Sequence, residues 1–95
     1  MGDSSRTYRG GVEEFLIERY WPGVTLDDVA RLSERLVGLG SVDAMFVGSL
    51  LVQADELVLF EFQAFDAQAA LEVSRSAGLR CDRIVSFRRV FPVNR

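Results

Sequence analysis

Two glutamates are the residues of this sequence best placed to do chemistry, because each interrupts a run of apolar residues. Glu18 lies in the run from Glu14 to Trp21, and Glu61 lies in the run from Leu57 to Phe65. Runs rich in branched and aromatic residues favour β-strands, whose side chains alternate between two faces. This alternation places both carboxylates on the same face of a sheet. Two carboxylates in a half-buried space raise each other's pKa, so the pair is suited to proton transfer or to a hard cation.

Tyr20 and an arginine extend this candidate site. Tyr20 follows Glu18 by two residues and therefore points to the same side of its strand. Arg88 and Arg89 point to opposite faces of the last apolar run, so that one of them reaches the same space and can bind an anion. We predict Glu18, Tyr20, Glu61 and Arg88 as ligand-binding residues. The sequence assigns no catalytic residue and identifies neither a cofactor nor a metal.

A purely structural interpretation of the two glutamates stays open. Each can instead pair with an arginine, either Arg88 or an arginine of a partner subunit, and fix the register of a dimer. The carboxylates would then hold two chains together and bind no ligand.

The residue types of the chain exclude several kinds of chemistry. There is no histidine, and Cys81 is the single cysteine. Imidazole catalysis, an intrachain disulfide and a thiolate metal cluster are therefore excluded. A chain of 95 residues has room for one core and little room for an internal active site. These features favour a binding or regulatory module over an enzyme.

The charge and hydropathy of the chain narrow the classes of partner and the cellular locations that are possible. The chain carries 11 basic and 14 acidic residues, for a net charge of −3, and this offers no basic surface to nucleic acid. No window approaches the roughly 20 apolar residues of a membrane-spanning helix. The polar, glycine-rich residues 1–11 lack the apolar centre of a secretory signal. We expect a mobile tail over 1–11, a single domain over 12–95, and a cytoplasmic protein without nucleic-acid or membrane partners.

The elements that must position the candidate residues follow a clear order. Thr25 and Asp28 form a capping box at the start of a first helix, and Asp66 and Gly78 bound a second helix. A four-residue polar connection after Val52 joins two apolar runs as an antiparallel hairpin. Strand, helix, strand, strand, helix and strand are expected over residues 14–21, 26–37, 42–52, 57–65, 67–77 and 81–90.

This order predicts an α+β, ferredoxin-like β-α-β-β-α-β fold, with a four-stranded antiparallel sheet and two helices on one face. Connection rules put the first and third strands in the centre. A face left to water should be polar, yet the third strand carries Leu57, Leu59 and Phe65 on the face away from the helices. Such a face predicts a homodimer in which two sheets pack together, as in a dimeric α+β barrel.

Several short phrases of the sequence carry a family resemblance by their shared order and spacing. They are Leu16 to Tyr20, Gly48-Ser49 through Ala54 to Glu56, Leu59 to Glu61, Ala77 to Leu79, and Cys81 to Ile84. They resemble a family of small actinobacterial ferredoxin-like proteins, a domain of unknown function whose best-described relatives are cytosolic dimeric nickel-binding proteins. The resemblance implies the same fold, a homodimer and a metal site. Those relatives use histidine among their ligands, and this chain has none, so we expect nickel to bind weakly or not at all.

Three classes of function are compatible with these features. The first is a cytoplasmic homodimer that binds a small molecule or a divalent cation. The second is a dimeric α+β barrel enzyme, similar to a monooxygenase or a cyclase, that uses carboxylates. The third is a structural or regulatory module that pairs with another protein through its exposed sheet.

Overall fold

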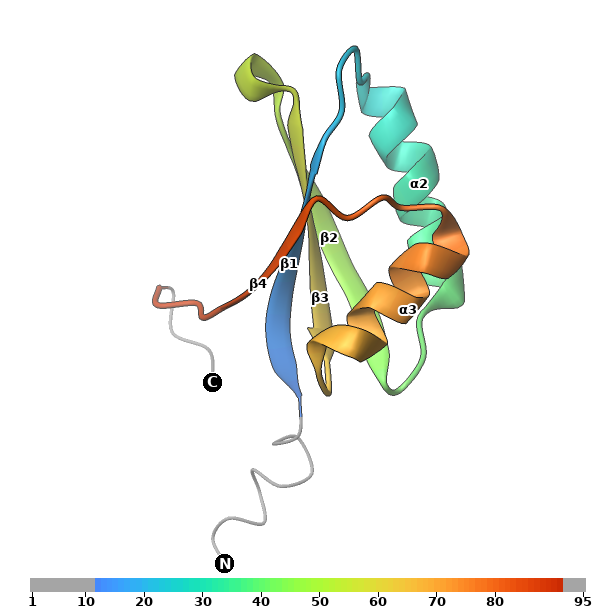
Figure 1. The fold of residues 1–95 in the computed structure, drawn as a ribbon, viewed down its shortest axis with the longest axis vertical. Helices are drawn as coiled ribbons and strands as arrows, with labels where there is room; N and C mark the ends of the chain where they lie inside the picture. The colour runs from blue at the N-terminus through green and yellow to red at the C-terminus, as the bar shows by residue number, and fades with distance from the viewer. Residues whose placement is uncertain (1–11, 92–95) are drawn as a thin grey trace, which may run out of the picture.

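A computed structural model describes residues 12–91, in which two helices pack against one side of an antiparallel sheet (Figure 1). The elements are β1 (Glu13–Tyr20), α2 (Leu26–Leu39), β2 (Ala44–Val52), the 3-10 helix η1 (Gln53–Asp55), β3 (Leu57–Ala64), α3 (Ala67–Ala77) and β4 (Arg83–Phe87). This order confirms the predicted ferredoxin-like α+β fold. The tail predicted over residues 1–11 lies outside the described residues.

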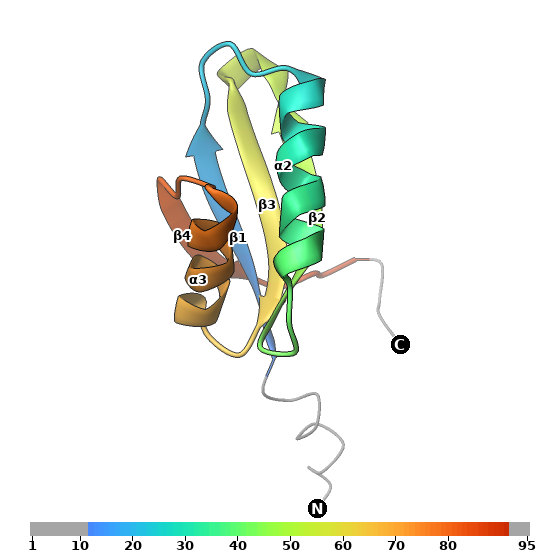
Figure 2. The same cartoon turned by 90° about the vertical axis from the view of Figure 1, so that its right-hand side faces the viewer.

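The four strands lie in the order β2-β3-β1-β4, so that β1 and β3 are central, as the connection rules predict. Both helices lie on the same side of the sheet (Figure 2). We call the other side, which no described helix covers, the open face. Neither α2 nor α3 has the length and apolar character that a helix needs to cross a membrane.

The hydrophobic core lies between the sheet and the helices. Its largest fully buried apolar side chains are Ile17, Leu32, Leu36, Val58, Phe60 and Phe62. Each of these contributes about 1.5 to 3 kcal/mol by leaving water. The core of the single chain is therefore built on the helix side of the sheet, and the side chains of the open face lie outside it.

The helix ends confirm the predicted caps. The Asp28 backbone N–H donates to the Thr25 hydroxyl at 3.1 Å, and the Thr25 N–H donates to the Asp28 carboxylate at 2.9 Å. Asp66 accepts a hydrogen bond from the Ala69 N–H at 2.9 Å. Gly78 adopts the left-handed conformation with φ 81° and ends α3. Local polar chemistry thus fixes where both helices begin and where α3 ends.

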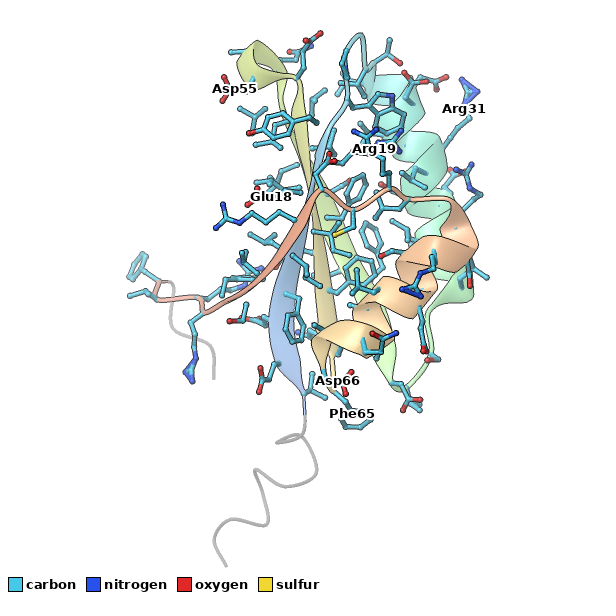
Figure 3. All side chains as sticks on the ribbon, viewed as in Figure 1. Glu18, Arg19, Arg31, Asp55, Phe65 and Asp66 are labelled. Atoms are coloured by element: carbon cyan, nitrogen blue, oxygen red, sulfur yellow. The ribbon has the colours of Figure 1, made fainter. Side chains whose placement is uncertain are left out.

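Two strands of the hairpin are shorter than expected. β2 begins at Ala44 and not at Val42, because Ser41 and Ala44 close a turn in which the Ser41 N–H donates to the Ala44 carbonyl at 2.8 Å. β3 ends at Ala64, and the expectation that Phe65 lies on the open face is wrong. The Phe65 N–H donates to the Asp43 carbonyl at 3.1 Å, and the ring lies beyond the strand, beside Asp66 (Figure 3).

β4 is also shorter than the expected 81–90, for a reason that involves a side chain. The Asp82 N–H donates to the Glu18 carbonyl at 2.9 Å, and its carboxylate accepts from the Tyr20 N–H at 2.8 Å. The carboxylate thus takes the place of a backbone carbonyl beside β1. Regular pairing begins at Arg83 and ends with Phe87 opposite Glu14.

Two irregular features interrupt the hairpin of β2 and β3. The pairing register shifts between Phe46 and Gly48, so that Val47 forms a β-bulge in β2. At the other end, Glu56 has a left-handed backbone with φ 51°. Its carboxylate accepts from the Gly23 N–H at 2.9 Å, and its carbonyl accepts from the Trp21 N–H at 2.7 Å. The connection therefore holds the chain where it leaves β1.

Candidate functional site

The open face brings together side chains from all four strands. Its members follow from the strand register and are Glu14, Leu16, Glu18 and Tyr20 of β1, Met45, Leu50 and Val52 of β2, Leu57, Leu59, Glu61 and Gln63 of β3, and Arg83, Val85 and Phe87 of β4. Much of this surface is apolar and exposed: 53% of Met45, 55% of Leu50 and 54% of Tyr20 is open to water. A contiguous apolar patch of this kind marks an interaction or ligand surface.

The structure confirms that Glu18 and Glu61 share one face. Glu18 lies opposite Leu59, and Glu61 lies opposite Leu16, so the two glutamates are diagonal neighbours on adjacent strands. Such a diagonal spans about 7 to 8 Å between Cα atoms. Figure 3 shows Glu18 on the side of β1 away from the helices and Arg19, the next residue, on the helix side. The alternation read from the sequence therefore holds in the central strands.

Each glutamate of the pair faces an arginine. Glu61 forms an ion pair with Arg89, whose Nε also lies 3.9 Å from Oε2 of Glu14. Glu18 Oε1 lies 3.9 Å from a terminal guanidinium nitrogen of Arg83. Within the single chain, 15% of the Glu61 side chain and 41% of the Arg89 side chain are exposed to water. This ion pair is therefore half-shielded from water. Arginine forks hold carboxylates in a defined geometry.

The arginine that reaches Glu61 is Arg89, so the alternative in which Glu61 pairs with Arg88 of its own chain is wrong. Phe87 is the last residue of β4 and lies on the open face, opposite Glu14. Two residues later the chain presents Arg89 to this face, whereas Arg88 is exposed and forms no ion pair with another described residue. The role of Arg88 in binding a ligand stays a prediction.

Tyr20 lies at the end of β1 on the same face as Glu18, as predicted. It is opposite Leu57, and its backbone N–H is held by the Asp82 carboxylate. This hydrogen bond, followed by the Arg80 guanidinium, lowers the pKa of Asp82 from its ordinary value. The contact fixes the backbone at Tyr20, two residues after Glu18 on the same face of β1.

Sequence reasoning missed Glu14 and Arg83 as members of this cluster, and of the two adjacent arginines it named Arg88 where Arg89 is the member. The signal was present in the last apolar run, because Arg83 and Arg89 are separated by an even number of residues and share its alternation. Glu14 was visible as the first residue of the same alternation as Glu18. Alternation along the last strand already groups Arg89 with Arg83, so the choice of Arg88 did not depend on where β4 ends.

A separate hollow of about 500 Å³ lies between the end of α3 and β4. Its lining residues are Leu71, Ser74, Arg75, Leu79, Arg80, Cys81, Asp82, Arg83 and Ile84. Burial, followed by the charge of Asp82, raises the pKa of the Cys81 thiol, which makes it a poor nucleophile near neutral pH. Cys81 also packs against the core. It is therefore a packing residue rather than an activated thiol.

The residues of the open face do not fit a nickel ion. Nickel prefers imidazole and thiolate ligands, the sequence has no histidine, and Cys81 lines the hollow beside α3. Between residues 12 and 91, no three side chains of Asp, Glu, Cys or His converge as a metal site would require. The carboxylates of Glu61 and Glu14 face Arg89 instead.

Comparison of the chain with protein-family models, with curated proteins and with solved structures gives no match. The open face is therefore the feature of the chain that bears on its function.

Proposed function

We propose that this chain is a cytoplasmic homodimer that binds a small organic ligand between two open faces, in the manner of a dimeric α+β barrel. The observation that carries the proposal is the composition of the open face: exposed apolar side chains along β2, namely Met45, Leu50 and Val52, beside a cluster of paired charges around Glu61. Two-fold pairing of equal faces is the commonest way to cover such a surface.

The charges of the cluster support a second copy of this chain as the partner. Glu14, Glu18 and Glu61 face Arg83 and Arg89, so both signs are present on one face. A surface of mixed sign is able to match a rotated copy of itself, whereas a surface of one sign would repel it. The half-shielded ion pair of Glu61 and Arg89 would become fully enclosed in the dimer.

The same enclosure would create the ligand site. Apolar side chains around a few convergent polar groups are the usual lining of a small-molecule pocket. Glu18, Tyr20, Glu61 and Arg88, together with Arg89, offer hydrogen-bond donors and acceptors to a ligand that has an apolar body and a polar group. A divalent cation is the weaker candidate, because arginines neutralise the carboxylates that would bind it.

The experiment is a measurement of mass by light scattering at micromolar concentration, for the parent and for Leu50→Asp. Leu50 lies opposite Leu59 in the middle of the patch, and a carboxylate there would have to lose its water on pairing. We expect a dimeric parent and a monomeric, folded variant. Leu26→Asp is the matched control, because Leu26 is 70% exposed at the start of α2, on the helix side. A parent mass near 10.6 kDa would contradict the proposal.

A further inference from the structure

The chain after β4 leaves the sheet on the side of the open face. In Figure 1 it projects away from the side that carries the helices, and in Figure 2 it passes behind the sheet from β4 towards the β2 side. Val90 is 86% exposed and Phe91 is 85% exposed. Among residues 12–91, this segment therefore carries two apolar side chains that are almost wholly exposed.

Arg89 holds the base of this segment above the sheet. Its guanidinium binds Glu61, approaches Glu14 and lies 5.7 Å from the centre of the Phe87 ring. The arginine side chain thus stands between the segment and the sheet of its own chain. Val90 and Phe91, which follow it, stay exposed and are not packed against that sheet.

We propose that residues 88–91 form an arm that packs Val90 and Phe91 against the open face of a second copy of this chain. The inference rests on the homodimer proposed above and names the segment that would complete its interface. By two-fold symmetry each chain gives one arm and receives one. The surface that receives it is the exposed apolar patch of Met45, Leu50 and Val52.

Charge complementarity favours a second copy over other occupants. The open face carries three carboxylates, those of Glu14, Glu18 and Glu61, against the guanidinium groups of Arg83 and Arg89. One carboxylate is therefore in excess. Arg88 is exposed and has no ion pair with a described residue, so Arg88 of the partner subunit supplies the missing positive charge when the arm is exchanged.

The test uses photo-crosslinking of the full chain. Phe91 is replaced by p-benzoylphenylalanine, which keeps the aromatic ring, and the protein is mixed with an equal amount of ¹⁵N-labelled parent before irradiation. We expect a covalent two-chain product whose crosslinked peptide comes from β2 or β3 of the labelled chain. The matched control carries the same group at Val42, which is 87% exposed in the turn before β2, and should give no such product.

A second measurement is needed because position 91 could contact the partner in a geometry that does not allow crosslinking. In the full chain, Val90→Ser combined with Phe91→Ser should weaken dimerisation by about tenfold or more, because two apolar side chains would no longer be buried, and Val42→Ser should leave it unchanged. A dimer that neither crosslinks through position 91 nor weakens in the double variant would overturn the arm and leave the homodimer standing. A parent that is monomeric would overturn both.

Discussion

The ion pair of Glu61 and Arg89 would contribute differently to stability in a monomer and in the proposed dimer. In the single chain Arg89 is 41% exposed, and pairs open to solvent contribute about 0 to 1 kcal/mol. Covered by a second sheet, the same pair would be buried, and removing one partner from a buried pair costs about 3 to 5 kcal/mol. Removing one partner of this pair would therefore report on the proposed dimer.

Replacing Glu61 by glutamine should destabilise the dimer far more than the monomer. Glutamine keeps the shape and removes the charge, which leaves Arg89 stranded only where the faces meet. The thermal midpoint of Glu61→Gln should fall well below that of the parent at high concentration and approach it on dilution. Glu34→Gln, at an exposed position of α2, is the control. An equal fall at every concentration would show that Glu61 stabilises the single chain.

If the glutamate also binds a ligand, Glu61→Gln has a second expected effect. The variant should lose affinity for any small molecule found to stabilise the parent in a thermal-shift screen, measured at a concentration where both proteins are dimeric. A variant that melts lower and still binds that compound as tightly would assign Glu61 a structural role alone.

Asp82 should give the protein a specific sensitivity to acid. The Tyr20 N–H and Arg80 lower the pKa of this carboxyl in the folded chain, so its contribution to stability is present above the ordinary aspartate pKa of about 3.9 and is lost as pH falls through the lower folded value. Asp82→Asn should melt below the parent at about pH 6 and converge with it towards about pH 2. A gap that stays constant over this range would show that the charge of Asp82 is not involved.

Residue-level reasoning from the sequence succeeded where it depended on periodicity alone. Glu18, Tyr20 and Glu61 lie on one face because strand side chains alternate. It failed for the partner of Glu61, since choosing between Arg88 and Arg89 requires knowing which alternating residues of β4 share the face of Glu18 and Glu61. That choice is set by the pairing of β4 with β1, a contact between residues far apart in the sequence.

Among the elements, the connection between β2 and β3 has more than a linking role. Glu56 adopts a left-handed backbone, which is unfavourable for a residue with a side chain. In this conformation its carboxylate accepts a hydrogen bond from the Gly23 N–H, and its carbonyl accepts one from the Trp21 N–H. A non-glycine residue in this conformation costs about 1 to 2 kcal/mol. The hydrogen bonds to the chain beyond β1 offset this cost.

Two substitutions at Glu56 should separate strain from hydrogen bonding. Glu56→Ala keeps the strain and loses the carboxylate, so the free energy of unfolding should fall by about 1 kcal/mol. Glu56→Gly also loses the carboxylate but relieves the strain, and should therefore stay close to the parent. Urea unfolding monitored by Trp21 fluorescence measures both. A glycine variant less stable than the alanine variant would show that the left-handed backbone is not strained.

The sequence predicted helix ends better than strand ends. The caps at Thr25 and Asp66 are made by residues within three positions of each other, and such local chemistry is visible in a sequence. β4 begins where the Asp82 side chain replaces a backbone carbonyl beside Tyr20. No local pattern announces a contact between residues so far apart.

For the whole molecule, element order was enough to predict the fold, because connection rules leave few arrangements for β-α-β-β-α-β. The order β2-β3-β1-β4 then fixes which side chains share the open face. The apolar runs indicated that this face is more apolar than a sheet face exposed to water usually is. They did not show how its charges pair, which depends on register across three strands.

The untagged protein should bind nickel no more tightly than about micromolar, because oxygen ligands alone favour magnesium, calcium or manganese. Isothermal calorimetry of the tag-free chain with nickel, and with manganese as the comparison, measures this directly. A submicromolar nickel dissociation constant would show that carboxylates outside the expected pattern form a transition-metal site.

The bulge at Val47 has a consequence for how copies of this chain can associate. β2 is the outermost strand on its side of the sheet, and its backbone would otherwise offer a regular row of hydrogen-bonding groups to another chain. The register shift between Phe46 and Gly48 breaks that row, and on the opposite border β4 pairs only over Arg83–Phe87 before two arginines follow. Both borders thus resist strand-by-strand growth into fibres. If copies associate through their open faces, as proposed, these borders favour a closed dimer over an open-ended fibre.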